Sequence, residues 1–163
     1  MDEQREKTRK KIITPLQARS KAEAYCAYQE RSQQEVRDKL YSYGLHRAEV
    51  EAIIADLITD NYLNEERFAL AYASGKFRMK GWGRYKIKLG LVQKAVSPPL
   101  IKLALSSLDD EAYTRKLKEI LEARARATKE NDPYKRKYKL LQYALGRGFE
   151  RELIMDILEA NDL

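Results

Sequence analysis

Basic side chains dominate the middle of this chain. From Arg67 to Leu108, a stretch of 42 residues, there is no aspartate and no glutamate. Nine lysines or arginines lie in the stretch: Arg67, Lys76, Arg78, Lys80, Arg84, Lys86, Lys88, Lys94 and Lys102. The whole chain has a net charge of +7, so the other residues together are slightly acidic. A field of one sign over this length attracts polyanions and steers their approach. We therefore expect a partner that is a nucleic acid, an acidic protein surface, or an assembly presenting both.

Aromatic residues are interleaved with the basic ones, namely Phe77, Trp82 and Tyr85. Cationic side chains can hold phosphates while aromatic rings stack on bases. The residues that we expect to contact a partner here are Lys76, Arg78, Lys80, Trp82, Arg84, Lys86, Lys88 and Lys94. Arg84 and Lys88 are one helical turn apart and would share a face. The alternative is a solvated positive face, with Trp82 a core residue between units rather than an anchor at the partner surface.

A second basic patch lies closer to the C-terminus. Its residues are Lys135, Arg136, Lys137 and Lys139, interleaved with Tyr134 and Tyr138. The patch either binds the same anionic partner or forms the solvated side of an amphipathic helix whose apolar stripe includes both tyrosines. Arg124, Arg126 and Lys129 lie just upstream and would extend it.

Side chains that could perform catalysis or hold a metal are sparse. His46 is the single histidine, and no cysteine or histidine lies near it at the spacing of metal ligands. The carboxylates of residues 109–111 suit a helix N-terminus better than acid–base chemistry. Gly81 and Gly83 lack the rest of a phosphate-binding glycine pattern. We therefore expect no catalytic, metal or cofactor-binding residues, no cofactor and no enzymatic activity.

The composition favours a helical protein with a packed core. Of 163 residues, 44% are hydrophobic and 35% are charged, while glycine (7) and proline (4) are scarce. Cys26 has no partner for a disulfide within the chain, which is typical of a reducing compartment, and we expect it in the core. No apolar run approaches the length that spans a bilayer, so we expect no membrane partner. The charged N-terminus lacks the apolar segment of a secretory signal, so we expect a cytoplasmic protein. We also expect a monomer. Residues 1–15 are predicted to form a flexible basic leader.

An internal repeat predicts how these residues are positioned. The chain aligns with itself at Gly44, Ala95 and Gly148. Apolar residues recur at equal offsets from these positions: Val36, Ile87 and Leu140; Leu40, Leu91 and Ala144; Leu45, Val96 and Phe149; Val50, Ile101 and Ile154; Ile53, Ala104 and Ile157; Ile54, Leu105 and Leu158. The offsets indicate two amphipathic helices on either side of a turn whose central residue is left-handed.

A further helical segment precedes each pair, over roughly residues 22–30, 64–77 and 110–128. The sequence thus predicts an all-α tandem array of three three-helix units, over residues 16–63, 64–109 and 110–163. Residues 85–91 alternate between apolar and polar, which alone is typical of a strand. The register of the repeat nevertheless predicts a helix there.

With these landmarks, the chain resembles the RecX family, regulators of the RecA recombinase. Four motifs carry the resemblance, at residues 31–40, 61–69, 80–83 and 147–149, and it covers roughly residues 16–161. Residues 61–69 read Asn-Tyr-Leu-Asn-Glu-Glu-Arg-Phe-Ala, where the family typically shows Gly-Tyr-Leu-Asp-Asp/Glu-x-Arg-Phe-Ala. The chain departs from the family at Asn61 and Asn64, at Ala95 in place of the usual Gly, and at Gly90 in place of a frequent Glu.

The resemblance implies a function that composition does not. RecX proteins are described as elongated, curved arrays that lie in the groove of RecA filaments on single-stranded DNA. There they limit filament growth, ATP hydrolysis, strand exchange and co-protease activity. The partners that the resemblance implies are the RecA filament and single-stranded DNA, with double-stranded DNA as a further candidate. One competing interpretation is a helical module that acts on DNA directly, because the helix pair around Gly44 resembles a helix-turn-helix. A weaker one is an unrelated helical scaffold such as an adaptor. Acidic residues on the second helices, such as Glu51, Asp56 and Asp156, count against base reading.

Overall fold

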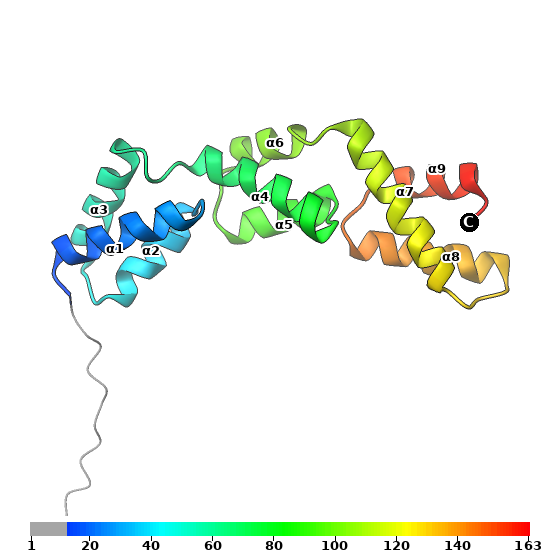
Figure 1. Ribbon diagram of the computed structural model, residues 1–163, viewed down its shortest axis with the longest axis horizontal. Helices are drawn as coiled ribbons and strands as arrows, with labels where there is room; N and C mark the ends of the chain where they lie inside the picture. The colour runs from blue at the N-terminus through cyan, green and yellow to red at the C-terminus, as the bar shows by residue number, and fades with distance from the viewer. Residues whose placement is uncertain (1–12) are drawn as a thin grey trace, which may run out of the picture. The chain divides into compact units, whose positions relative to one another are not determined.

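The structure is a computed structural model that describes residues 13–163, and this range contains nine helices and no strand (Figure 1). The helices are α1 (Pro15–Tyr28), α2 (Gln33–Ser42), α3 (Arg47–Thr59), α4 (Glu65–Lys80), α5 (Arg84–Gln93), α6 (Pro98–Ser106), α7 (Asp110–Ala127), α8 (Pro133–Gly146) and α9 (Arg151–Asn161). They form three tandem three-helix domains, α1–α3, α4–α6 and α7–α9, which confirms the predicted all-α repeat. None of these helices combines the length and apolar character needed to cross a membrane.

Local sequence signals set the helix starts. Thr14 caps α1 by accepting a hydrogen bond from the Gln17 amide, and Pro15 follows as the first helical residue. For this reason α1 begins several residues before the predicted start near residue 22. The predicted leader lies outside the described residues except for its last three. Asp109 and Asp132 cap α7 and α8 in the same way as Thr14 caps α1.

The three turns of the repeat share one conformation. Gly44, Ala95 and Gly148 have φ of 86°, 58° and 94°, which confirms the predicted left-handed residue in each turn. The apolar residue that follows is buried in every case: Leu45, Val96 and Phe149. Ala95 therefore keeps the turn geometry although its Cβ makes this conformation unfavourable by roughly 1–2 kcal/mol.

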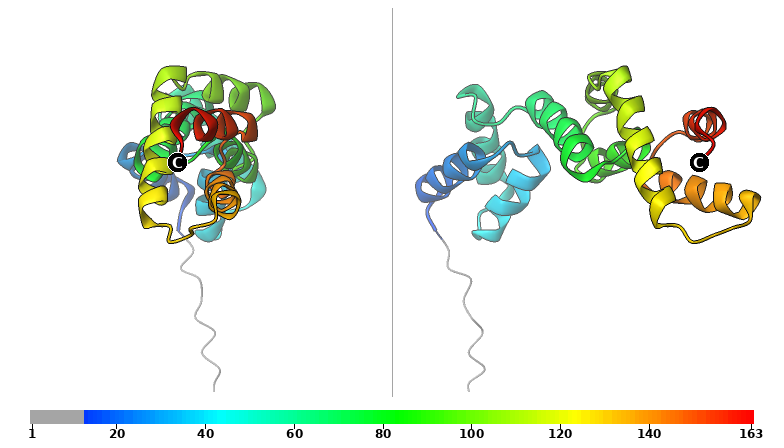
Figure 2. Two further views of the ribbon diagram at one scale, coloured as in Figure 1. Left: turned by 90° about the vertical axis from the view of Figure 1, so that its right-hand side faces the viewer. Right: turned by 45° about the vertical axis from the view of Figure 1, so that its right-hand side comes forward.

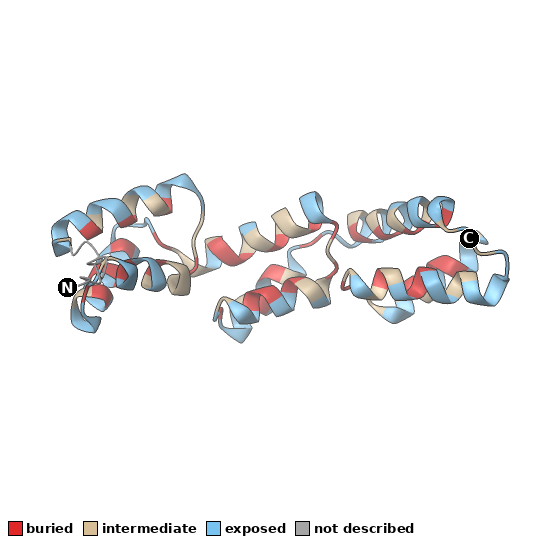
Figure 3. Ribbon diagram, turned by 90° about the horizontal axis from the view of Figure 1, so that it is seen from below, coloured by how far each residue is buried: buried red, intermediate tan, exposed pale blue. Residues whose placement is uncertain are grey.

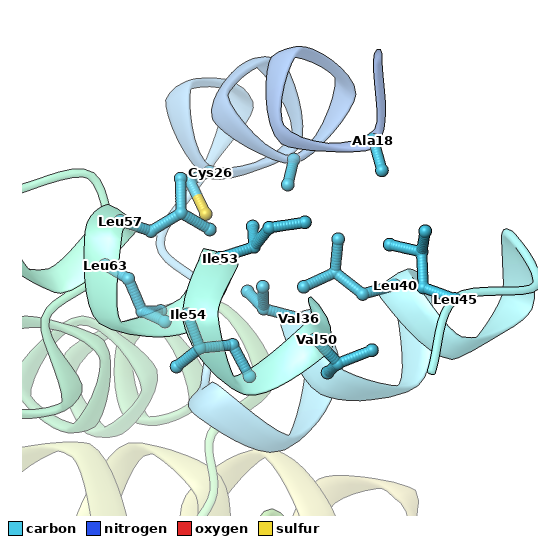
Figure 4. Close-up of a cluster of buried hydrophobic side chains, with 11 residues drawn as sticks. Ala18, Cys26, Val36, Leu40, Leu45, Val50, Ile53, Ile54, Leu57 and Leu63 are labelled. Atoms are coloured by element: carbon cyan, nitrogen blue, oxygen red, sulfur yellow. The ribbon is translucent and has the colours of Figure 1, made fainter. Parts of the chain in front are cut away.

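The chain divides into two compact units, one ending at Phe68 and one spanning Ala69–Leu163. In the first unit α1 packs on both α2 and α3. Figure 4 shows its core, where Cys26 points into a cluster with Leu57 and Ile53. The expected core position of Cys26 is confirmed, because 7% of the residue is exposed.

The second unit contains most of α4 and all of α5–α9. Within it α7 lies beside α8 and α9 (Figure 2). Buried and exposed positions alternate along its helices, as expected for amphipathic segments (Figure 3). Residues 85–91 are helical, as the repeat predicts. Gly90 is buried against α4, where an added Cβ would lie 2.9 Å from Cζ of Tyr72 and closer still to its hydroxyl.

Candidate partner-binding surface

The N-terminus of α5 is held by the turn between α8 and α9. The amide of Gly83 donates to the carbonyl of Arg147 over 2.8 Å, and the amide of Tyr85 donates to the carbonyl of Gly148 over 3.0 Å. The first amides of a helix have no partner within it, so these carbonyls satisfy groups that would otherwise need water. The second and third domains are therefore joined through the backbone at the centre of the predicted site.

Arg84 lies at the same junction and pairs with two carboxylates. Its guanidinium contacts Glu150 at 3.0 Å and Asp110 at 2.8 Å, and its Cζ lies 3.9 Å from the centroid of the Tyr113 ring. Tyr113 is buried, accepts from the Arg84 amide over 3.0 Å and donates to Glu150. Burial, together with the bond to Glu150, raises the pKa of the Tyr113 phenol. The structure thus gives Arg84, a predicted partner contact, a role in joining α5 to α7 and α9.

Trp82 is half-buried in the loop between α4 and α5 and gathers two lysines. The Nζ atoms of Lys76 and Lys86 lie 4.9 Å and 4.8 Å from its ring centroid. A cation over an indole face is attracted by the ring quadrupole, so Trp82 holds two positive charges close to its ring. The half-buried ring thus lies between two cations, and its role as an anchor for a partner stays a prediction.

Other predicted residues lie on the surface of α4 and α5. Arg78, Lys80 and Lys88 are exposed. The carbonyls of Arg78 and Lys80 accept hydrogen bonds from Lys116 and Arg147 of the third domain, at 3.3 Å and 2.7 Å. The end of α4 is therefore anchored while its cationic side chains face solvent. Lys94 is the C-cap residue of α5 and is half-buried.

A groove of about 660 Å³ lies between α5 and α6. Its lining residues are Arg84, Lys88, Val92, Pro98, Ile101, Lys102, Leu105 and Ser106. Lys102 was not among the predicted site residues, although it is exposed and lines the same groove as Lys88. The repeat could have indicated that Lys102 lies near Lys88, because the two residues lie seven positions after and before Ala95 on paired helices.

The second basic patch is largely paired within the third domain. Arg136 donates to the carbonyls of Leu163, Thr128 and Ala125 at 3.1, 2.8 and 2.7 Å. Lys137 lies 3.7 Å from Glu159, and Lys139 lies 2.9 Å from Glu130. The hydrogen bond from Lys139 lowers the pKa of the Glu130 carboxyl.

The remaining residues of the patch are more open to solvent. Lys135 and its neighbour Tyr134 are exposed. Arg124 and Lys129 line, together with Lys139, a hollow of about 600 Å³ between α7 and α8. The structure thus gives three of the four predicted residues internal partners and leaves Lys135 on the surface.

Arg67, the first of the nine basic residues, has a structural role in the junction motif. Its guanidinium contacts Glu30 at 2.8 Å and donates to the Asn61 side chain and backbone at 2.8 and 3.1 Å. Asn61 lies two residues after Thr59, the last residue of α3, and has φ of 63°, a conformation that Asn tolerates better than most residues. Asn64 caps α4 by accepting from the Arg67 amide. Both departures from the family motif thus keep the turn and cap geometry.

The described residues offer little for metal chemistry. His46 is exposed at the start of α3, and residues 13–163 contain no cluster of three His, Cys, Asp or Glu side chains suited to a metal ion. The carboxylates of residues 109–111 lie at the N-terminus of α7, as predicted, where Asp109 accepts from the Ala112 amide.

Comparison with known families gives three matches in tandem. The models described as the first, second and third three-helix domains of RecX match residues 18–57, 64–105 and 110–158. The regulatory protein RecX of Clostridium perfringens (strain SM101 / Type A) is 34% identical over 131 residues, which are 78% of this chain and 60% of that protein. That of Clostridium acetobutylicum is 30% identical over 148 residues, 88% of this chain and 68% of that protein. The chain thus spans about 60% of the length of the first curated relatives it matches.

Solved structures agree with the fold. RecX from Lactobacillus salivarius superposes with a TM-score of 0.83 and 26% identity, over 91% of this chain and 96% of that one. A second structure, of a regulatory protein RecX, gives a TM-score of 0.81 at 21% identity, which bears on the fold alone.

Proposed function

The chain belongs to the RecX family of regulatory proteins, and from this premise we propose that it is a non-enzymatic modulator, mainly an inhibitor, of the RecA recombinase. It binds in the groove of RecA filaments on single-stranded DNA. There it limits filament growth, and with it ATP hydrolysis, strand exchange and co-protease activity. It acts as a monomer in the cytoplasm.

The basic stretch from Arg67 to Leu108, which carries no carboxylate, is the observation that supports this proposal most. Arg78, Lys80, Lys88 and Lys102 are exposed on helices that carry no carboxylate between Arg67 and Leu108. A filament of recombinase on DNA contains phosphates, and cationic side chains are attracted to phosphates and to acidic protein surfaces alike. This role requires no catalytic group, because a protein bound in the groove of the filament obstructs filament growth by its presence.

The pairing of Arg84 narrows the proposed contact surface. Its charge is compensated by Asp110 and Glu150, so its removal would disturb the domain junction before it affected a partner. We place at the partner surface Lys76 and Lys86, which lie against Trp82, and the exposed Arg78, Lys80, Lys88 and Lys102. Lys135 is the residue of the second patch that we retain.

The test is ATP hydrolysis by RecA on single-stranded DNA with increasing amounts of this chain. We expect inhibition below equimolar ratios, because blocking growth at few positions affects many protomers. Shortening of filaments in electron micrographs at the same ratios would accompany it. Unchanged hydrolysis at an equimolar ratio would refute the proposal.

The alternative is a module that acts on DNA directly, which the basic surface would also permit. The acidic outer side of α3 weighs against α3 as a recognition helix. There Arg37 contacts Glu51 at 2.7 Å and lowers the pKa of its carboxyl, and Arg19 bridges Asp56 and Asp60. The alternative predicts that the chain binds DNA with the same affinity whether or not recombinase is present. Titrating the chain into labelled duplex and single-stranded DNA, with and without recombinase, tests this.

A further inference from the structure

At the groove between α5 and α6, one apolar position of the repeat is accessible from outside, whereas the equivalent position is buried in the other two domains. Ile54, Leu105 and Leu158 occupy the same place in the repeat, ten residues after the turn. Ile54 and Leu158 are 4% and 5% exposed, whereas Leu105 is only half-buried and lines the groove. The second domain thus leaves a core position of the repeat accessible from outside.

An exposed apolar stripe continues this surface along α5. Tyr85, Leu89 and Val92 are 64%, 57% and 53% exposed, and their spacing places them on one side of the helix. Val92 also lines the groove, so the stripe adjoins the apolar part of the groove formed by Val92, Ile101 and Leu105. Contiguous apolar surface of this kind on a folded domain marks an interaction site more often than isolated exposed side chains do.

The charged side chains that line the groove, Arg84, Lys88 and Lys102, are all cationic, and Arg84 is paired with Asp110 and Glu150. Lys88 and Lys102 line it from α5 and α6, and neither helix carries a carboxylate. An acidic segment would be held by these lysines, while a basic one would be repelled. The apolar lining of Val92, Ile101 and Leu105 is aliphatic, which suits Leu, Ile or Met side chains better than bases, since bases stack on aromatic rings.

From this combination we infer that the α5–α6 groove docks an amphipathic, carboxylate-bearing segment of the partner protein. The apolar side chains of the segment enter the groove beside Leu105 and Val92, and its carboxylates pair with Lys88 and Lys102. The inference rests on the proposed function, since it specifies the protein half of the filament contact. The DNA half is left to the basic cluster around Trp82.

The experiment measures binding of the labelled full chain to RecA filaments on poly(dT), and separately to poly(dT) alone. We expect Val92→Asp and Lys88→Glu each to weaken filament binding by about tenfold or more, because a docking site concentrates its energy in few residues. Binding to poly(dT) alone should change less than about twofold, since few phosphates contact the groove. Circular dichroism establishes that each variant keeps its helical content.

Matched controls lie on neighbouring surfaces. Leu103→Asp alters an exposed leucine of α6 that does not line the groove, and Lys118→Glu reverses an exposed lysine of α7. Both should bind filaments like the unmodified chain. Equal loss in controls and groove variants, no loss in the groove variants, or equal loss on poly(dT) would each overturn the inference.

A photo-cross-linking amino acid at Val92 identifies the occupant. We expect cross-links to a recombinase peptide that contains both carboxylates and large aliphatic residues. Cross-links to DNA, or to a peptide without carboxylates, would contradict the inference. If the unmodified chain neither binds nor inhibits filaments, the proposed function is wrong. If the unmodified chain does both, and Val92→Asp and Lys88→Glu bind filaments as tightly as it does, only the inference about the groove is wrong.

Discussion

Gly83 and Gly148 lie backbone against backbone, with no room for a side chain between them. A Cβ on Gly83 would lie 2.5 Å from the Phe149 amide nitrogen and closer still to the Gly148 carbonyl. The φ of Gly83 is −82°, which any residue can adopt, so its small size is required by contact and not by backbone conformation. The joint between the second and third domains depends on this approach.

Gly83→Ala should therefore destabilise the second unit by about 1–3 kcal/mol, the usual cost of overpacking. Thermal unfolding followed by circular dichroism measures the effect. Hydrogen exchange should show faster exchange of the Tyr85 amide, which donates to Gly148. Gly75→Ala is the matched control, because an added Cβ there meets nothing within 4 Å and a helix favours Ala over Gly. An unchanged melting temperature in Gly83→Ala would contradict the close approach.

A substitution at Ala95 is expected to stabilise the protein. It adopts φ of 58° in a turn where Gly44 and Gly148 occupy the other two domains. Ala95→Gly should raise the free energy of unfolding by about 1 kcal/mol, because removing Cβ relieves a left-handed conformation. Urea unfolding measures this change. Gly44→Ala, the reverse substitution in the first domain, should destabilise by a similar amount, and a stabilising Gly44→Ala would refute the explanation.

The sequence was sufficient for the repeat and its turns but not for the joint between domains. Hydrophobic offsets around Gly44, Ala95 and Gly148 depend on local helix geometry, which periodicity encodes directly. The contact of Gly83 with Gly148 joins segments 65 residues apart, and no local pattern reports such a pair. For the same reason, Arg84 was assigned to a partner, because its carboxylates, Asp110 and Glu150, are supplied by other helices.

The buried thiol of Cys26 should react slowly in the folded protein. Burial raises the pKa of this thiol, which reduces the thiolate available near neutral pH, and 7% exposure limits access. Labelling with a disulfide reagent at pH 7.5 should be at least about tenfold slower than in denaturant. The control combines Cys26→Ala with Ala27→Cys, which moves the thiol to an exposed neighbour of α1 and should restore fast labelling. Equal rates for both thiols would show that the α1 contact opens readily.

Charge reversal should separate stability from partner binding on α5. Arg84→Glu places a third carboxylate beside Asp110 and Glu150, so it should lower the melting temperature and disturb the joint at Tyr113. Lys88→Glu changes an exposed residue on the same helix and should leave the melting temperature within about 2 °C, because most surface substitutions cost little.

Inhibition of RecA hydrolysis should show the complementary pattern. Lys88→Glu should weaken inhibition, and increasing salt should weaken inhibition by the unmodified chain as charges are screened. Thermal unfolding measures the effect on the joint between domains. The concentration of the chain that gives half-inhibition of RecA measures the effect on the partner surface. If Lys88→Glu unfolded the protein, or if it inhibited as strongly as the unmodified chain, the division between a structural Arg84 and a partner-facing Lys88 would be wrong. A triple reversal of Arg84, Lys86 and Lys88 would confound the two, because loss of the joint alone would abolish binding.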